Sequence, residues 1–282
     1  MTSEARYSES PSPYEWIEND KGFETVKVTY GITGIRSSEK TDWPRSGKPN
    51  IWMIRHGGEA VIVDSAYGDK PEMEGLQMVW EQAQKPHIRA IIATHEHGDH
   101  IGGIEKLREL TNPDVVIDPY RFRRIPDTSF LPPFVHIIPT PGHTNEDLSV
   151  YVKSKQILLT GDFIVGNGLG TSIGTRHAGV LLGSLEKVEQ LNLKAMCPGH
   201  GSVIDKPYEK IIDIRSRQFY RMSQVIEKLS ETKDPVHFNE IVEKIYPDNF
   251  YQGEGQIEAY IAYLLMEEVV VDLGNGYFSL RQ

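Results

Sequence analysis

The 282-residue sequence has one cysteine, no long hydrophobic run and fewer basic than acidic residues. A lone Cys197 excludes an internal disulfide framework and predicts a reducing compartment, the cytoplasm. No apolar run approaches the ~20 residues that span a bilayer, so we expect no membrane segment. The formal net charge is −10. Nucleic acid is therefore an unfavourable partner unless a local basic groove overrides that charge, because phosphate binding is mostly electrostatic.

The chain divides by character into three parts. Residues 1–20 open with a Ser-, Glu- and Pro-rich stretch without the apolar core of a secretory signal, and we expect a disordered lead-in. Residues 21–208 alternate strand-like and helix-like segments and form the predicted catalytic domain. Residues 209–282 carry three helical patterns and a terminal β-hairpin with a Gly-Asn-Gly turn, as in a small winged-helix-like domain. Its third helix is acidic, which favours packing or homodimerisation over DNA binding.

Hydrophobic periodicity predicts the elements of the catalytic domain. The predicted strands are 25–30, 50–55, 60–63, 88–93, 115–117, 135–138, 148–152, 156–159 and 194–197. The predicted helices are 71–84, 101–110 and 184–191. Polar residues follow several of these strands, which is where α/β folds place their chemistry.

The densest polar group is Thr-His-Glu-His-Gly-Asp-His at residues 94–100, between a strand-like run and a helix-like start. It contains His95, His97, Asp99 and His100, and later loops add His143, Asp162 and His200. Histidine and aspartate are the ligand types that zinc-like divalent ions select. His95 and His97, two residues apart, are able to bind one ion, while Asp99 and His100 face elsewhere and suit a second. The context favours a metal site over an ordinary polar turn.

The order of these residues resembles the metallo-β-lactamase superfamily, in which His-x-His-x-Asp-His precedes a lone His, an Asp and a final His. The resemblance implies an α/β fold, the four-layer αβ/βα sandwich, with its site at one edge between two sheets. It implies two divalent metal ions, with zinc expected and iron or manganese as alternatives. A hydroxide shared by the ions would attack the substrate.

The same resemblance assigns a role to each position. His95, His97 and His143 would hold the first ion, and Asp99, His100 and His200 the second. Asp162 would bridge the ions, and Asp64 would orient a ligand. Asp99 and Asp162 would be the catalytic carboxylates.

Several branches of the superfamily can be compared with the sequence. Secreted zinc β-lactamases use a cysteine ligand and a signal peptide, and transfer-RNA 3′-processing nucleases carry a long arm; the sequence shows neither feature. Glyoxalase II shares the ligand set but has a C-terminal helical domain with basic and tyrosine residues for glutathione, whereas the helices and wing of this tail are more similar to lactamase-like endoribonucleases and related thioesterases. We expect hydrolysis of a small-molecule ester, thioester or lactone. The alternatives are a single-strand endoribonuclease and a persulfide dioxygenase-like enzyme with one iron.

Two further segments are candidates for substrate contact. Arg176 and His177, after a glycine-rich loop, are predicted to contact an acidic substrate group, or else form an ordinary surface pair. Residues 120–124 interleave aromatic and arginine side chains, as an RNA groove would. A solvated loop is the favoured interpretation of this second segment, given the acidic charge of the whole chain.

Overall fold

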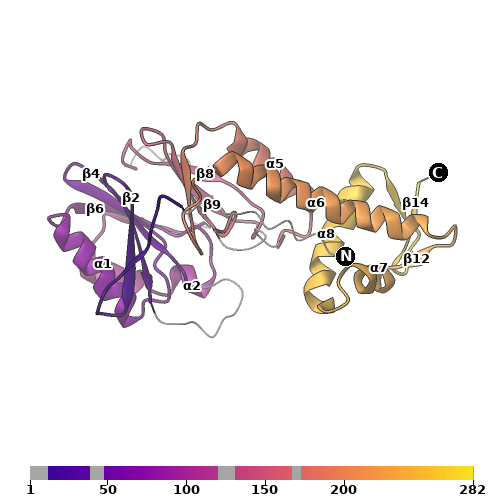
Figure 1. The fold of residues 1–282 in the computed structure, drawn as a ribbon, viewed down its shortest axis with the longest axis horizontal. Helices are drawn as coiled ribbons and strands as arrows, with labels where there is room; N and C mark the ends of the chain where they lie inside the picture. Colours follow the sequence, from indigo (N-terminus) through magenta and orange to yellow (C-terminus); the bar gives the residue numbers. More distant parts are fainter. Residues whose placement is uncertain (1–11, 39–47, 120–130, 167–172, 282) are drawn as a thin grey trace.

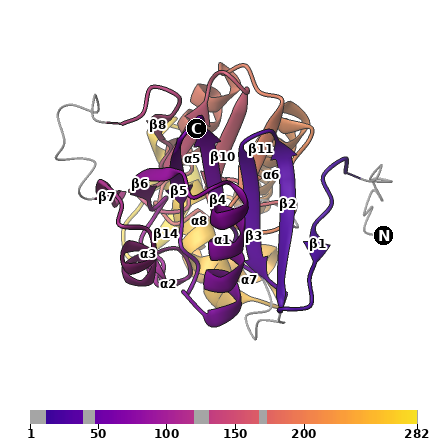
Figure 2. The same ribbon diagram turned by 90° about the vertical axis from the view of Figure 1, so that its left-hand side faces the viewer.

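The computed structural model describes residues 12–38, 48–119, 131–166 and 173–281. Two sheets lie face to face (Figures 1 and 2). The first contains, in spatial order, β1 (Ile17–Glu18), β2 (Phe23–Thr29), β3 (Ile32–Ser37), β4 (Ile51–His56), β5 (Glu59–Val63), β6 (His87–Ile92) and β7 (Val115–Ile117). The second contains β11 (Ala195–Pro198), β10 (Ile157–Gly161), β9 (Leu148–Val152) and β8 (His136–Pro139).

Strand β5 shows why both faces of the first sheet are covered. Ala60 and Ile62 point into the cluster with α1 (Lys70–Gln82) and α3 (Ile104–Thr111), while Val61 and Val63 point toward the second sheet. Successive side chains of a strand face opposite sides, so a strand with apolar residues at every position needs cover on both. This explains the nearly continuous hydrophobic pattern of β5.

Helices complete the layers on the other side. A third buried cluster joins the outer face of the second sheet to α5 (Ala178–Glu189) and α6 (Pro207–Ser230). The order helix, sheet, sheet, helix is the predicted four-layer α/β sandwich, and the prediction of the fold is confirmed.

The tail continues from α6, which runs from beside α5 into the last part of the chain (Figure 1). It contains α7 (Phe238–Ile245), α8 (Phe250–Met266) and a three-stranded sheet of β12 (Val236–His237), β14 (Tyr277–Leu280) and β13 (Val270–Asp272). One buried cluster includes both β10 and α7. The boundary at 208/209 and the winged-helix-like character stay predictions. Among the described residues, none of the helices has the length and apolar character needed to cross a membrane.

Three local predictions differ from the structure. Disorder over residues 1–20 is wrong at β1, which pairs with β2 while the Trp16 ring lies 5.9 Å from that of Trp52; residues 1–11 lie outside the described part. Strand β3 was not predicted, because Gly34 interrupts its alternation. Helix α5 begins at Ala178 rather than 184, because His177 caps it: its Nδ1 accepts a hydrogen bond from the Gly179 amide.

Candidate metal centre

The seven predicted ligands meet at one edge of the sandwich because the strands that precede them end there. Strands β5 and β6 are parallel, as are β10 and β11, and β8 runs in the direction of β10 because both pair antiparallel with β9. The ligands directly follow β6, β8, β10 and β11, or lie in the short helix α2 (Gly98–Ile101): His95, His97, Asp99, His100, His143, Asp162 and His200. Strand direction therefore places residues more than 100 positions apart beside one another.

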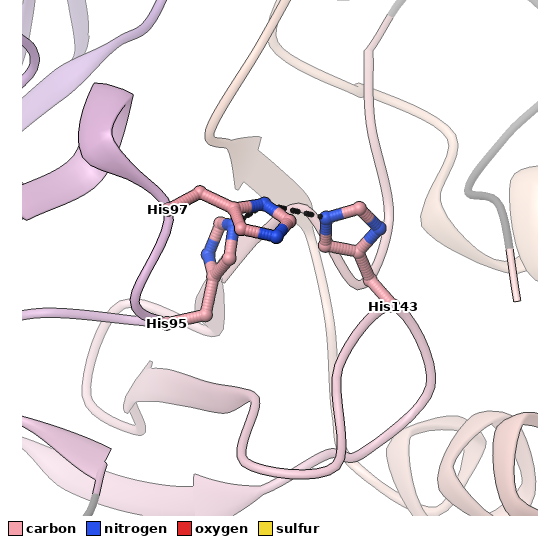
Figure 3. Close-up of side chains that lie close together, drawn as sticks. All are labelled: His95, His97 and His143. Carbon is pink, nitrogen blue, oxygen red and sulfur yellow. Dashed lines mark hydrogen bonds between the residues drawn. The ribbon is translucent and has the colours of Figure 1, made fainter. Parts of the chain in front are cut away.

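Three imidazoles form the first group of ligands (Figure 3). His97 Nδ1 lies 3.0 Å from His95 Nε2 and 3.1 Å from His143 Nε2. His97 and His143 lie toward solvent, while His95 is fully buried. Three ring nitrogens that converge from two sheets are a set of donors that could hold a metal ion.

The second group combines one carboxylate with two imidazoles. His200 Nε2 lies 3.1 Å from Asp99 Oδ2 and 3.3 Å from His100 Nε2. Both histidines are buried, whereas Asp99 is partly exposed. An ion held here would keep one side open toward solvent.

Asp162 lies between the two groups. Its Oδ1 is 3.5 Å from His100 Nε2, and its Oδ2 is 3.6 Å from His200 Nε2 and 3.9 Å from His143 Nε2. Asp162 Oδ1 is buried and accepts no hydrogen bond from the described residues, an arrangement that costs free energy unless a cation is bound. A Cβ on Gly199 would stand 2.6 Å from this oxygen and from His100 Cε1. The side chains present therefore fit a metal ion.

Asp64 supports the ligands of the first sheet. Its carboxylate accepts hydrogen bonds from the Thr94 amide at 2.7 Å and the Thr94 hydroxyl at 3.0 Å, and lies 2.9 Å from His100 Nδ1. The Nδ1 contact directs His100 Nε2 toward the centre, as carboxylate partners of metal-binding histidines do. Asp64 adopts a left-handed backbone (φ 61°), a strained conformation that such sites often contain.

Two residues of the first sheet hold the loop that carries His200. Asn50 Nδ2 donates to the carbonyls of Pro198 (2.9 Å) and Gly201 (3.0 Å), and Trp52 Nε1 donates to the Pro198 carbonyl at 2.9 Å. All of these groups are buried. The sequence analysis missed both donors, because nothing local to residues 50–52 indicates a contact about 150 positions away.

Asp147 plays a similar part for His143. Its carboxylate accepts hydrogen bonds from the amide (2.8 Å) and the hydroxyl (2.5 Å) of Thr144, the residue after the ligand. Burial raises the pKa of Asp147 to about 7, although the Thr144 bonds lower it. The sequence analysis missed Asp147 too, but its place four residues after His143 is a signal for a turn of this kind.

Burial and neighbouring charges set the protonation of the ligands. Burial lowers the pKa of His95, and the nearby His100 and His143 lower it further, so this ring is neutral. Burial also lowers the pKa of His100, but Asp64 and Asp162 raise it more, to about 9. Burial raises the pKa of Asp99, but the His200 bond and the nearby His100 lower it more, to about 2. Asp99 is therefore ionised at neutral pH and attracts cations.

The sequence profile described as "Metallo-beta-lactamase superfamily" matches residues 45–135 and 119–200, together more than half of the chain. The chain belongs to this superfamily. A relative from Caenorhabditis elegans, "Beta-lactamase-like protein 2 homolog", is 27% identical over 79% of this chain and 79% of its own length. An Aspergillus fumigatus protein, "Atrochrysone carboxyl ACP thioesterase", is 25% identical over 63% of this chain and 58% of its own length.

Solved structures show the same superfamily fold. A beta-lactamase domain protein from Burkholderia ambifaria superposes with a TM-score of 0.72 at 16% identity, over 95% of this chain and 97% of its own. A metallo-beta-lactamase family protein from Thermus thermophilus gives a TM-score of 0.64 at 17% identity, over 90% and 100%. Both matches extend past Pro207, since the residues before it are less than three quarters of the chain.

The predicted substrate residues contact α5 and α8. Arg176 is exposed, has a left-handed backbone (φ 56°) and lies 3.9 Å from Glu258. His177 caps α5, and its ring packs edge-on to Tyr263 at 6.2 Å. Their role in substrate contact stays a prediction. Residues 120–124 lie outside the described residues.

Proposed function

We propose that this protein is a dinuclear metal hydrolase that cleaves a small acyl substrate, with a thioester as the first choice and an oxygen ester or lactone next. The observation that carries the proposal is the convergence of two ligand groups on Asp162, whose carboxylate lies within 3.9 Å of His143 in one group and of His100 and His200 in the other. A carboxylate placed in this way is what two neighbouring cations share.

The residues present divide between two ions. His95, His97 and His143 would hold one, Asp99, His100 and His200 the other, and Asp162 would contact both. Imidazole and carboxylate ligands suit zinc, with iron or manganese as alternatives. When bound, such ions supply a nucleophilic hydroxide near neutral pH and polarise the substrate carbonyl.

The chain contributes fixed orientation and charge. Asp64 and Asp147 hold the loops of His100 and His143, so that the ligand nitrogens keep their direction. Asp99 is ionised and partly exposed, which leaves its carboxylate able to accept a hydrogen bond from a water at the open side. As a metal ligand it is poorly placed to serve as an acid.

The preference for a thioester rests on the relatives. Proteins described as ACP thioesterases match this chain over about two thirds of its length, although this chain spans only 58% of theirs. The net charge of −10 agrees with a small acyl substrate better than with RNA.

Metal content and a substrate panel test the proposal. Purified protein should contain about two equivalents of zinc-like metal per chain. It should hydrolyse thioesters, esters or lactones with a far higher kcat/KM than it cleaves single-stranded RNA at physiological salt. One equivalent of iron with oxygen consumption would overturn the hydrolase and favour the persulfide dioxygenase.

The RNA alternative has its own outcome. Efficient RNA cleavage that falls steeply with salt, and collapses when Arg121, Arg123 and Arg124 are all replaced by alanine, would overturn the small-molecule substrate. It would make residues 120–124 the RNA groove. Retained thioester hydrolysis in the same triple variant supports the proposal.

A further inference from the structure

A trough of about 750 Å³ lies between α5, α6 and the end of α8. We call it the helix trough. Six residues define it, from α5, α6 and α8 in turn: Val180, Gly183, Glu186, Phe219, Tyr263 and Met266. Its volume falls in the range of small-molecule sites, about 300–1,000 Å³.

The walls of the helix trough carry large apolar groups that face solvent. Phe219 is 48% exposed and Met266 is 58% exposed. Val180 and Tyr263 are partly buried beside them. Apolar surface gathered around a concavity is characteristic of a ligand or interaction site, because water wets it unfavourably.

The charges in the helix trough exclude an anionic occupant. Among the described residues that line it, Arg215 is the one arginine or lysine, and it donates two hydrogen bonds of 2.6 and 3.3 Å to Glu189. Glu186 adds a negative charge at an exposed position. A phosphate or free carboxylate would therefore meet repulsion, whereas an uncharged chain would meet apolar walls.

One end of the helix trough is tied to the metal centre. His177 lines that end, and Gly174 lies three residues earlier, a distance of at most about 10 Å along the chain. The Gly174 amide donates to the Gly142 carbonyl at 3.0 Å, and a Cβ on Gly174 would stand 1.9 Å from the His143 carbonyl oxygen. The backbone that carries one ligand is thus packed against the segment that opens the trough.

The same segment is fixed to the trough wall. Gln256 of α8 accepts a hydrogen bond from the Ile173 amide (3.3 Å) and donates one to the Ile173 carbonyl (3.1 Å). On the other side, the Ser184 hydroxyl of α5 donates to the Pro141 carbonyl at 2.7 Å. Helices α5 and α8 therefore keep a constant relation to the loop of His143.

We infer that the helix trough binds the unbranched apolar chain of an acyl thioester whose carbonyl lies at the metal centre. The inference rests on the proposed function and names its substrate class, medium- to long-chain acyl groups. Each methylene that enters the trough loses contact with water, so kcat/KM should rise with chain length until the trough is full. Short acyl groups would reach the metal centre but leave the trough unused.

The test compares butanoyl, decanoyl and palmitoyl thioesters on the metal-loaded protein. Decanoyl should exceed butanoyl in kcat/KM by at least about tenfold. Gly183→Phe should bring the ratio of the decanoyl to the butanoyl kcat/KM close to one, because a side chain at Gly183 points into open space within the trough. Gly58→Phe is the matched control, since Gly58 also faces open space but lies at the β4–β5 turn, away from the metal-site edge.

A second pair of variants compares the loss of a side chain that lines the trough with the loss of one beside it. Phe219→Ala should lower the ratio several-fold, while Tyr220→Ala, at an exposed neighbour outside the lining, should leave it unchanged. Binding of a non-hydrolysable palmitoyl thioether, measured by calorimetry on metal-stripped protein, gives a readout independent of turnover. The affinity for the palmitoyl thioether should be at least tenfold lower in Gly183→Phe.

The outcomes separate this inference from the proposed function. Thioester hydrolysis with no dependence on chain length, and no effect of Gly183→Phe on either readout, overturns the trough and leaves the hydrolase standing. Thioether binding that Gly183→Phe weakens, without turnover of any thioester, overturns the hydrolase but supports the trough. A dimer in sedimentation that Gly183→Phe dissociates, with unchanged chain-length dependence, would make the trough an interface between two copies of the chain.

Discussion

The two sheets supply the metal centre in different ways. The first sheet delivers four ligands from six consecutive residues, 95–100, at the end of β6 and in α2. The second sheet delivers His143, Asp162 and His200 from three separate loops. The first set is fixed by one turn of the chain, and the second depends on contacts between distant segments.

The supporting residues follow the same division. Asp64 serves the first sheet from the neighbouring parallel strand, through Thr94 and His100. The second sheet needs Asp147 for one loop, and Asn50 and Trp52, from across the sandwich, for another. A site of this kind becomes complete only when the two sheets pack, so its geometry reports on the packing of the whole sandwich.

The largest effect should come from the residue that contacts both sets. Asp162→Asn should lower hydrolysis by about 100-fold or more, because a neutral amide holds two cations poorly. The fold should be retained, as circular dichroism would show. Near-normal turnover with both metals bound would show that Asp162 does not bridge the two halves.

The next prediction distinguishes the ligands supplied by the first sheet from those supplied by the second. Asp64→Asn should lower the affinity for the ion that His100 would hold by about 10–100-fold. Asp147→Asn should lower the affinity for the ion that His143 would hold by a similar factor. Stepwise metal titration would resolve two binding events, and each variant should shift a different one. If both variants shift the same event equally, the division between the sheets is wrong.

A third prediction concerns the stability of the first sheet and its covering helix α1. Burial raises the pKa of Glu72, in the first turn of α1, from 4.5 to about 7, although backbone hydrogen bonds lower it. The folded state then binds this proton more tightly than the unfolded state. The contribution of Glu72 to the free energy of unfolding, on the order of 3 kcal/mol, is present below pH 4.5 and is lost as pH rises through 7.

Glu72→Gln should therefore flatten the fall in the free energy of unfolding across this pH window, as urea denaturation would measure. Glu74→Gln, on an exposed part of the same helix, is the control and should leave the slope as it is. An unchanged slope in Glu72→Gln would contradict the raised pKa.

The smallest effect on stability is expected for a single hydrogen bond between α5 and the loop of His143, beside the second sheet. Ser184→Ala removes the bond to the Pro141 carbonyl and should lower the free energy of unfolding by about 1 kcal/mol. Ser216→Ala, at an exposed position of α6, should change it little. Equal effects in both variants would mean that the bond between α5 and the loop of His143 contributes nothing.

The sequence predicted the parts of the site that strand ends and residue spacing determine. His95 to His100 are recognisable from their spacing, and the strand direction that joins His143, Asp162 and His200 follows from alternating helices and strands. The four layers were predicted from the resemblance to the metallo-β-lactamase superfamily, and the nearly continuous hydrophobic run of β5 agrees with them.

The sequence did not predict contacts made across the sandwich. Asn50 and Trp52 look like ordinary strand residues, and their partners are nearly 150 positions away. The early residues around Trp16 seemed disordered because their order comes from a ring contact with Trp52, not from local propensity. The sequence does not identify the substrate either, since proteins with one fold catalyse many different reactions.

Helix α6 joins the sandwich and the tail as a single rod of 24 residues, about 36 Å long. Its buried isoleucine, methionine, valine and leucine side chains belong to one apolar cluster that runs from β10 and α5 through α7 and α8. The tail therefore does not form a separate packing unit: a chain cut before Pro207 would lose the α6 side of the apolar cluster that covers the outer face of the second sheet. Both parts should therefore melt in one cooperative transition.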